Sequence, residues 1–253
     1  MNYKILINLI LSLNFSFFIK LINIFFKKLP LKMNNNSLEF CYKNKEDLES
    51  YLLNLDKNLF KESKKINELL NKKSQKKIRE FNFELGGGAN CILIYFFSRY
   101  YKPEIIYETG VSYGFSSNIF LNAIKKNNIG LLYSSDLPYL KIKNSQSAIG
   151  CLVDDGLKKY WKLNIKGDTN SALEFTKGNK LIDLFHYDSD KSFLGKFITF
   201  NIIKKKFSKN CIIIFDDIQT DNFFPYLVKK NSFNYKVFYS KHDKCYQGII
   251  FFE

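Results

Sequence analysis

Histidine and arginine are almost absent from this 253-residue chain. The only histidines are His186 and His242, which excludes a metal centre built from several histidines of one chain. The only arginines are Arg79 and Arg99. The bidentate guanidinium fork that recognises phosphate groups and guanine is therefore scarce.

Paired cysteines are missing as well. The chain has five widely spaced cysteines, and none of them forms a C-x-x-C pair. This spacing disfavours a zinc ribbon, an iron–sulfur cluster and a disulfide framework, and it favours reduced intracellular thiols. The five are Cys41, Cys91, Cys151, Cys211 and Cys245.

Apolar residues and lysine are abundant instead. A hydrophobic content of 46% is enough for one sizeable core, and it excludes a disordered chain. The net charge of +15 suggests a nucleic acid or an anionic membrane as partner. However, 37 of the 39 cations are lysine, and Asn, Ile, Phe and Tyr are also frequent, so an A/T-rich genome explains the charge equally well. A nucleic-acid partner is therefore disfavoured.

The N-terminal segment, residues 1–33, begins with a strongly apolar stretch whose polar residues follow one helical stripe. Its longest uncharged run, residues 5–19, is shorter than the about 20 residues of a membrane span, and no A-x-A-like cleavage site is present. We expect an amphipathic helix that contacts a membrane surface through residues 1–28. The alternatives are a helix packed on the domain or on a second subunit, and a genuine span. The stripe comprises Lys4, Asn8, Ser12, Ser16, Lys20, Asn23 and Lys27.

Residues 34–85 are predicted to form a lysine-rich helical extension, which begins with a linker at residues 34–37. Residues 1–80 hold 16 cations and 8 anions, so the most basic part of the chain precedes the predicted catalytic domain, residues 86–253. The simplest interpretation of this charge is a solvated helix face. Apolar residues at near-helical spacing are Leu48, Leu52, Leu55, Leu59, Ile66, Leu69 and Leu70.

The remainder of the chain alternates short β-rich apolar runs with helical stretches. Five such units predict an α/β fold with a Rossmann-like, seven-stranded, mostly parallel sheet and helices on both faces. Residues 241–244 are too few for a crossover helix, so the last two strands form an antiparallel C-terminal hairpin. The predicted strands are Ile105–Glu108, Leu131–Ser134, Trp161–Ile165, Leu181–His186, Cys211–Phe215, Tyr235–Tyr239 and Tyr246–Phe252. The predicted helices are Ala89–Tyr101, Ser116–Lys126, Ser171–Lys177, Ser192–Phe207 and Phe223–Lys230.

A glycine-rich turn follows the first of these strands and has the pattern E-x-G-x-x-x-G-x-S, from Glu108 to Ser116. Glycines at such a turn let the backbone approach a ligand closely. The spacing differs from the G-x-G-x-x-G dinucleotide fingerprint, which argues against NAD. With Asp136 ending the next strand, the pattern favours a nucleoside whose ribose hydroxyls donate to carboxylates.

These motifs together resemble the class I S-adenosylmethionine-dependent methyltransferases, and are most similar to the cephalosporin-hydroxylase-like and macrocin-type O-methyltransferases. The resemblance starts near Gly86 and reaches the C-terminus. It is carried by the glycine-rich turn and by Ile149–Val153 with Trp161, Gly167–Thr169, Leu181–Asp190 (close to the group's D-x-F-H-x-D-S-D-H-S signature) and Ile212–Ile218 with its paired aspartates.

The resemblance implies S-adenosylmethionine as cofactor. It assigns the methionine part of the cofactor to Glu108 and to the turn from Gly110 to Gly114, the ribose hydroxyls to Asp136 and the adenine amine to Asp168. For Asp168, capping of the following helix is the alternative. The complete set of predicted cofactor-binding residues is Glu108, Gly110, Ser112, Gly114, Ser116, Asp136 and Asp168.

Three further acids, Asp188, Asp216 and Asp217, end the fourth and fifth predicted strands, where ligands bind in open α/β sheets. Carboxylates that converge there repel one another unless a cation lies among them, and Mg²⁺ suits oxygen ligands. Helix capping or solvation of these acids is the alternative. Lys191 is the candidate base that accepts the proton of the substrate hydroxyl, because catechol-type O-methyltransferases carry a lysine three residues after their first metal-binding acid. The cephalosporin-hydroxylase-like group has histidine at this position, and His186 is expected to be a core residue.

The predicted activity is methylation of a hydroxyl on a small molecule, a sugar or a lipid-linked glycan, assisted by a divalent metal. The alternative is an RNA-binding methyltransferase, or a non-catalytic protein that binds RNA or a membrane surface through its basic N-terminal region. The expected location is the cytoplasm, with peripheral contact at the inner membrane surface. The sequence leaves open whether the chain forms a homo-oligomer.

Overall fold

The computed structural model places most of the chain, but not the predicted N-terminal membrane-binding segment, residues 1–33. Within the described part of the chain, no helix is long and apolar enough to cross a membrane. All five cysteines are free thiols, as their spacing predicts. The described residues are 36–86, 88–139, 142, 145–241 and 244–252.

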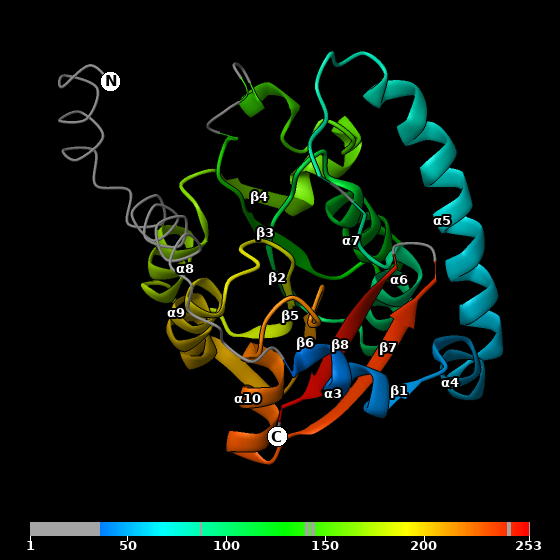
Figure 1. The fold of residues 1–253 in the computed structure, drawn as a ribbon. Helices are drawn as coiled ribbons and strands as arrows, with labels where there is room; N and C mark the ends of the chain where they lie inside the picture. The colour runs from blue at the N-terminus through cyan, green and yellow to red at the C-terminus, as the bar shows by residue number, and fades with distance from the viewer. Residues whose placement is uncertain (1–35, 87, 140–141, 143–144, 242–243, 253) are drawn as a thin grey trace, which may run out of the picture.

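One eight-stranded sheet lies at the centre of the fold, in the order β1-β7-β8-β6-β5-β2-β3-β4 (Figure 1). Strands β2 to β6 are mutually parallel, whereas β8 is antiparallel to both β6 and β7. The predicted α/β fold with a C-terminal hairpin is therefore confirmed. The strands are β1 (Lys45–Glu46), β2 (Ile105–Thr109), β3 (Leu131–Ser135), β4 (Trp161–Asn164), β5 (Ile182–Tyr187), β6 (Phe207–Phe215), β7 (Asn234–Ser240) and β8 (Cys245–Phe251).

The eighth strand, β1, was not predicted. Its two residues lie in the lysine-rich extension and pair with β7, Lys45 opposite Val237 and Glu46 opposite Phe238. Two exposed charged residues have no hydrophobic alternation, and only their pairing with a distant edge strand makes them a strand.

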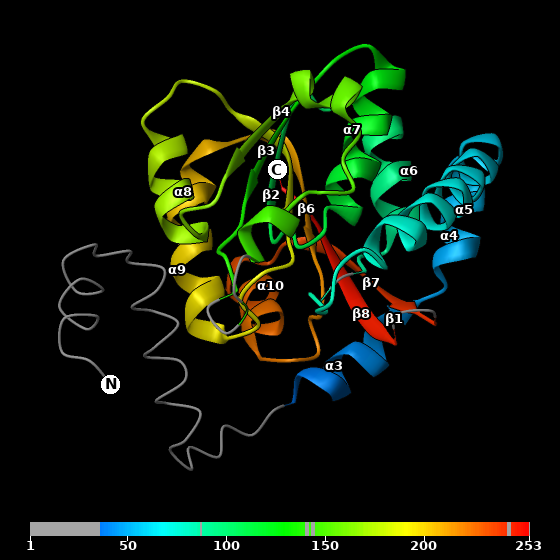
Figure 2. The same ribbon diagram turned by 90° about the horizontal axis from the view of Figure 1, so that it is seen from above.

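Helices cover both faces of the sheet. Helices α6 and α7 lie on one face with α5 outside them, and α8, α9 and α10 lie on the other (Figure 2). The helices are α3 (Ser37–Asn44), α4 (Leu48–Leu55), α5 (Lys57–Ile78), α6 (Cys91–Tyr101), α7 (Phe115–Asn127), α8 (Asp168–Thr176), α9 (Phe193–Ile203) and α10 (Phe223–Asn231), with short 3₁₀ turns η1 (Ser145–Ala148), η2 (Asp155–Tyr160) and η3 (Lys204–Lys206).

Several predicted boundaries are wrong. Strand β6 begins at Phe207 rather than Cys211, and α8 begins at Asp168 rather than Ser171. Helix α9 ends at Ile203 rather than Phe207, because the three lysines of η3 form a separate turn and Phe207 pairs with Ile182 as the first residue of β6. The predicted linker at residues 34–37 overlaps α3, which begins at Ser37, where the serine hydroxyl donates to the carbonyl of Gln219 at 2.7 Å.

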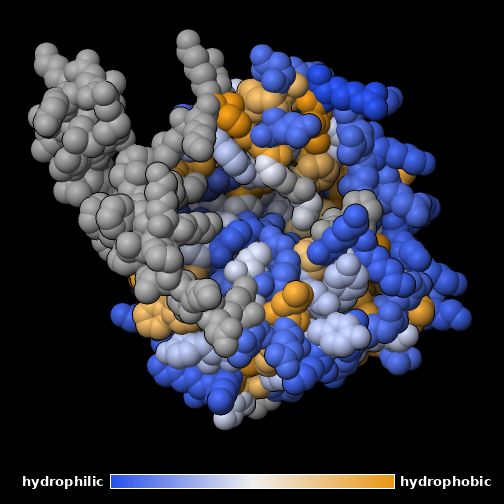
Figure 3. All heavy atoms as spheres, in the orientation of Figure 1, coloured by the Kyte–Doolittle hydropathy of each residue, from blue (hydrophilic) through white to orange (hydrophobic). Residues whose placement is uncertain are grey.

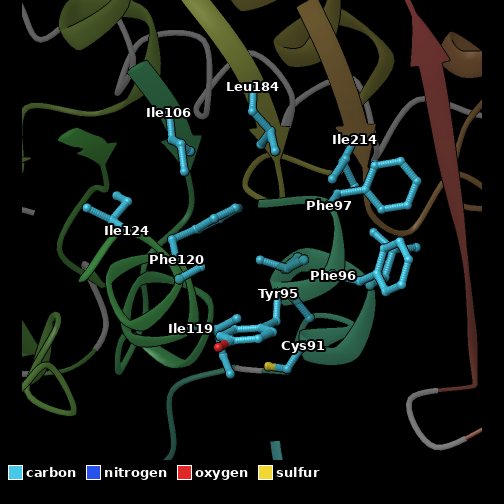
Figure 4. Close-up of a cluster of buried hydrophobic side chains, with 14 of the residues drawn as sticks. Cys91, Tyr95, Phe96, Phe97, Ile106, Ile119, Phe120, Ile124, Leu184 and Ile214 are labelled. Carbon is cyan, nitrogen blue, oxygen red and sulfur yellow. The ribbon is translucent and has the colours of Figure 1, made fainter. Parts of the chain in front are cut away.

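The hydrophobic core on the α6–α7 side fixes the faces of the central strands. Ile106, Leu184 and Ile214 come from β2, β5 and β6, and they point toward α6 and α7 (Figure 4). Because side chains alternate along a strand, residues two positions further on continue this face toward the carboxyl edge of the sheet. This alternation determines which polar residues meet at that edge.

Helix α5 forms the outer layer on the same side, where Figure 3 shows a mainly hydrophilic surface. Its N-terminus is capped by Asp56, whose carboxylate accepts from the amides of Asn58 and Leu59 at 2.9 Å each. Most of the lysine side chains of α5 are exposed, and its apolar residues pack against α6. The predicted solvated helix face is therefore what the structure contains.

Candidate active site

The carboxyl edge of the parallel strands gathers the predicted site acids. Glu108 lies in β2, Asp136 directly follows β3, and Asp168 begins α8 just after β4. Asp188 follows β5, and Asp216 with Asp217 follows β6. Since parallel strands end at a common edge, the acids that the sequence disperses over about 110 positions come to lie along one side of the sheet.

The glycine-rich turn between β2 and α7 is built for close backbone contact. Gly110 and Gly114 have φ angles of 82° and 95°, in the left-handed region that favours glycine. A Cβ at Gly110 would overlap the carbonyl of Asp188, and one at Gly114 would lie 2.9 Å from Cα of Gly150. Both glycines are thus required by packing between loops at this edge.

Asp136 fixes the same turn from the neighbouring strand. Its Oδ2 accepts from the amides of Val111 and Ser112 at 3.0 and 2.6 Å, and its Oδ1 accepts from the amide of Leu137 at 2.6 Å. The Ser112 hydroxyl in turn donates to the carbonyl of Gly86. The predicted ribose acid and the predicted methionine-binding turn therefore form one hydrogen-bonded unit.

Glu108 is completely buried, and its partners are hydroxyl groups. Its carboxylate accepts from Ser116, from Ser117 at 2.6 Å and from Ser134 at 2.7 Å. Burial raises the pKa of Glu108 to about 7, although the three serine hydroxyls act in the opposite direction. A buried carboxylate that has only neutral partners has strong affinity for an added cation.

Asp168 does not cap α8. The N-cap is Gly167, which has no side chain, and Asp168 occupies the first helical position. Its Oδ1 instead accepts from the hydroxyl of Ser135 at 2.9 Å. Burial raises its pKa to about 6, with Asp136 among the further causes. The geometry thus differs from the capping alternative and directs the carboxylate toward the ends of the neighbouring strands.

Lys191 lies inside the acid cluster. Its ammonium contacts Asp188 and lies 2.9 Å from Oδ2 of Asp217, so one cation joins the ends of β5 and β6. Burial lowers the pKa of Lys191, but the two carboxylates outweigh burial and raise it. In this arrangement Lys191 is a firmly held ammonium.

Asp216 faces inward, away from solvent. Its Oδ1 accepts from Nε2 of Gln247 at 2.9 Å and from the amide of Asp217 at 3.1 Å, and Sγ of Cys245 lies at 3.6 Å. Burial, together with the nearby Asp188 carboxylate, raises the pKa of Asp216 to about 7, although Gln247 and Lys191 act in the opposite direction. Among the described residues, the ligand atoms that come within 4.8 Å of one another form two sets, namely His186 with Asp188 and Asp216, and Asp216 with Asp217 and Cys245.

Sequence reasoning missed three residues of this edge. His186 is the expected core residue, 1% exposed and packed on Phe120, yet it also reaches Asp188 and Asp216. The sequence signal was the His-x-Asp spacing, which places both side chains on one face of β5. Cys245, and Lys196 with its 2.7 Å ion pair to Asp221, gave no sequence signal, because β8 and α9 reach the site only through the tertiary fold.

Comparison with known proteins finds a methyltransferase domain model that matches the central part of the chain. Residues 107–218 match a family model described as a methyltransferase domain. None of the curated proteins matches the chain. The family match covers the glycine-rich turn and all three predicted metal-binding acids, and it confirms the predicted resemblance to S-adenosylmethionine-dependent methyltransferases.

Solved structures share the fold. An O-methyltransferase from Streptomyces achromogenes involved in tomaymycin synthesis, in complex with SAM, is 15% identical, with 88% of this chain and 99% of that chain covered and a TM-score of 0.57. A methyltransferase from Geobacter sulfurreducens is 16% identical, covering 73% and 88%, with a TM-score of 0.56. An O-methyltransferase from Bacillus cereus in complex with SAH is 11% identical, covering 80% and 94%, with a TM-score of 0.53.

Proposed function

We propose that this S-adenosylmethionine-dependent methyltransferase methylates a hydroxyl group of a small molecule or sugar, with a divalent cation at the acid cluster. The observation that carries the proposal is the convergence of Asp188 and Asp217 on one cation, the Lys191 ammonium. The O-methyltransferases among the similar structures support the choice of oxygen as the acceptor atom.

The cofactor is proposed to lie along the ends of β2, β3 and β4. Glu108 and the turn from Gly110 to Gly114, with Ser112 and Ser116, would hold its methionine part, Asp136 its ribose hydroxyls and Asp168 its adenine amine. The fit is chemical, because the ammonium, hydroxyl and amine groups are donors, and each of these acids is an acceptor. When bound, the cofactor supplies the electrophilic methyl group, so the main task of the protein is orientation.

The cation, proposed as Mg²⁺, would be bound by oxygens of Asp188, Asp216 and Asp217. Asp188 and Asp217 already hold an ammonium, and all three carboxylates supply the hard oxygen ligands that Mg²⁺ prefers. A cation beside the acceptor oxygen would stabilise the negative charge that develops there during proton loss.

Lys191 is the proposed proton acceptor. The bridging ammonium cannot accept a proton, so this role requires Lys191 to leave Asp188 and Asp217 and to release one proton to water before the neutral amine takes the proton of the acceptor hydroxyl. Its position three residues after Asp188, at 33% side-chain exposure, allows it to turn away from the carboxylates toward a bound acceptor. Replacement of Lys191 by methionine is expected to lower kcat by about 100-fold with little change in cofactor affinity.

Methyl-transfer assays with labelled S-adenosylmethionine and a panel of hydroxylated compounds, with and without a chelator, test this function. Asp188→Asn is expected to lower the rate by about 100-fold or more. Asp155→Asn is the matched control, because it removes the same charge from a residue that is 94% exposed and lies outside the acid cluster. Activity that resists both the chelator and Asp188→Asn would exclude the metal-assisted mechanism.

Membrane attachment through residues 1–28 is a separate proposal. It is supported by the apolar composition and the polar stripe of this segment, followed by Lys27, Lys28 and Lys32. Flotation with anionic liposomes should be lost on deletion of residues 1–28. A truncated protein that aggregates instead would favour packing of the segment on the domain.

A further inference from the structure

A cavity of about 480 Å³ lies between α8 and the strands β3 and β4. Strand β4 is an edge strand of the sheet, so the cavity lies at the side of the molecule rather than at the carboxyl edge. It extends to the loop of residues 178–180, which leads from α8 toward the amino end of β5. A volume of roughly 300–1,000 Å³ is typical of sites for small molecules. This space is called the α8 cavity below.

The α8 cavity is separate from the proposed cofactor and cation sites. Successive side chains of a strand point to opposite faces of the sheet. Tyr107 packs against Phe175 of α8, whereas the next residue, Glu108, accepts from Ser116 and Ser117 of α7 on the other face. None of the described residues that line the α8 cavity is assigned to the cofactor or to the cation.

Three aromatic rings form one wall of the α8 cavity. The ring of Phe175 lies edge-on to the rings of Tyr107 and Tyr133, with centroids 5.1 Å apart in both pairs and interplanar angles of 74° and 76°. Aromatic side chains of this kind pack well against another flat ring, either edge-on or offset-stacked. The wall therefore favours a ligand with an aromatic body.

Two buried hydroxyl groups that line the cavity lack a hydrogen-bond partner. Tyr107 and Ser171 are 2% and 4% exposed, and neither hydroxyl oxygen has a partner among the described residues. Burial, with the Asp168 carboxylate as a smaller cause, raises the pKa of Tyr107, so its phenol stays neutral. Buried hydroxyls are normally hydrogen-bonded, and each of these can donate to or accept from a polar atom of a ligand.

Two lysines make the exposed side of the cavity positive. Lys162 of β4 and Lys180 line the cavity and are exposed, and Nζ of Lys180 lies 5.8 Å from the ring centroid of Tyr133. The acid of the cavity, Glu174, is held by Lys166 at 2.9 Å and by Asn164 at 3.1 Å. Since Glu174 is already paired, the two lysines favour an anionic group on the ligand.

We propose that the α8 cavity is a second ligand site, which binds a small aromatic carboxylate whose ring has a polar edge. The ring lies against the aromatic wall, its polar edge reaches the hydroxyls of Tyr107 and Ser171, and its carboxylate faces Lys162 and Lys180. The site goes beyond the proposed function, because it uses neither the acceptor nor the cation of that reaction.

Indole-3-acetate is a suitable probe, because it combines a flat ring, an N–H edge and a carboxylate. Calorimetric titration of the full-length protein, saturated with S-adenosylhomocysteine, should show one binding site per chain. The neutral indole-3-acetamide keeps the shape without the charge, and it should bind about 10-fold more weakly at low salt. No binding of indole-3-acetate, its loss in the presence of S-adenosylhomocysteine, or equal affinities of the two probes would overturn the proposal.

The two unpartnered hydroxyls place the probe in the cavity. Tyr107→Phe and Ser171→Ala each remove one hydroxyl, and each should weaken indole-3-acetate binding by about 3- to 10-fold. Because neither hydroxyl has a partner within the protein, urea unfolding should show no loss of stability in either variant. Full probe affinity in both variants, or a loss of stability without a loss of affinity, would overturn the proposal.

The two exposed lysines give a test that does not disturb the core. Lys162→Gln combined with Lys180→Gln should weaken indole-3-acetate binding by about 10-fold and leave the affinity for indole-3-acetamide unchanged. Lys229→Gln is the matched control, because it removes the same charge from an exposed lysine of α10 that does not line the cavity. An equal effect of the control, or unchanged affinity in the double variant, would place the probe elsewhere and reject the site.

Discussion

The outer helical layer contains a partly buried glutamate, Glu62, and the carboxyl edge of the sheet contains a fully buried one, Glu108. Their surroundings shift the pKa of the two side chains in opposite directions. In the helical layer, Glu62 of α5 accepts from Tyr95 at 2.7 Å and pairs with Arg99 and Lys126 at 3.1 and 2.8 Å. Burial raises its pKa, but these partners outweigh burial and lower the pKa to about 2. At the sheet edge, Glu108 has only hydroxyl partners, and its pKa rises to about 7.

The partners of a buried carboxylate indicate whether it stabilises the fold or is available to a ligand. A carboxylate with cationic partners stabilises the fold, here by joining α5 to α6 and α7. A carboxylate buried among neutral hydroxyls opposes folding when it is ionised, and it gains a favourable partner only when a cationic ligand arrives. The sulfonium and ammonium groups of S-adenosylmethionine are such partners. The net charge of +15 therefore says less about function than the few acids at the sheet edge.

The largest effect that tests this comparison is expected from Glu108→Gln. It should weaken S-adenosylmethionine binding by about 10- to 100-fold in calorimetry, because a charge-assisted interaction is lost. It should also stabilise the free protein by up to about 3 kcal/mol at pH 8, since no charge has to be buried. A variant that loses stability at pH 8 would contradict the assignment of Glu108 as an acid retained for ligand binding.

The sign of the pH dependence follows from the raised pKa. The folded-state pKa of Glu108 is about 7, above the value of 4.5 for an unperturbed glutamate. Ionisation thus costs more in the folded state, and this contribution lowers stability as the pH rises from about 4.5 to about 7. The stabilisation by Glu108→Gln should be absent near pH 4 and complete at pH 8 in urea unfolding.

Glu62→Gln should have the opposite effect on stability: it should destabilise the protein at neutral pH. The folded-state pKa of about 2 lies below 4.5, so the ion pairs of Glu62 contribute stability above pH 4.5, and this contribution is lost as the pH falls toward 2. Because Glu62 is about one quarter exposed, we expect a loss of about 1–2 kcal/mol at pH 7. Chemical unfolding at pH 7 and pH 3 measures it. Cofactor affinity should not change, and a change there would remove the distinction between the two regions.

The positions of the site acids could be predicted from the sequence because they depend on local pattern. Asp136, Asp188 and Asp216 each follow an apolar run of strand length, and parallel strands end at one edge whatever their order in the sheet. The glycine-rich turn was equally readable, because its glycines have φ angles that other residues rarely adopt.

Contacts between segments that are far apart in the chain could not be predicted from the sequence. The spacing of Lys191 from Asp188 was readable from the sequence, but the insertion of its ammonium between Asp188 and Asp217 depends on the loop after β5. Strand β1 likewise exists because β7 offers an open edge, and its two residues have no pattern of their own. Local periodicity therefore predicts elements and their ends, whereas partners across the fold need coordinates.

Loss of the N-terminal cap of α5 should lower the stability of the protein less than Glu62→Gln does. Asp56→Ala removes the carboxylate that accepts from the amides of Asn58 and Leu59 at the start of α5. We expect a loss of about 1 kcal/mol in the free energy of unfolding, with cofactor affinity unchanged. Asp56→Asn, which retains an acceptor oxygen, is the matched control and should lose less.

The smallest effect is expected from an exposed ion pair of the same helix. Lys73 of α5 lies 2.6 Å from Asp154, and the two side chains are 62% and 42% exposed. Water screens such a pair, and ordering two mobile side chains offsets most of the attraction, so Lys73→Met should change stability by less than about 0.5 kcal/mol. A loss as large as that of Glu62→Gln in urea unfolding would mean that geometry rather than burial decides which ion pairs hold the outer layer. It would thereby remove the basis for treating the buried acids at the sheet edge as a separate class.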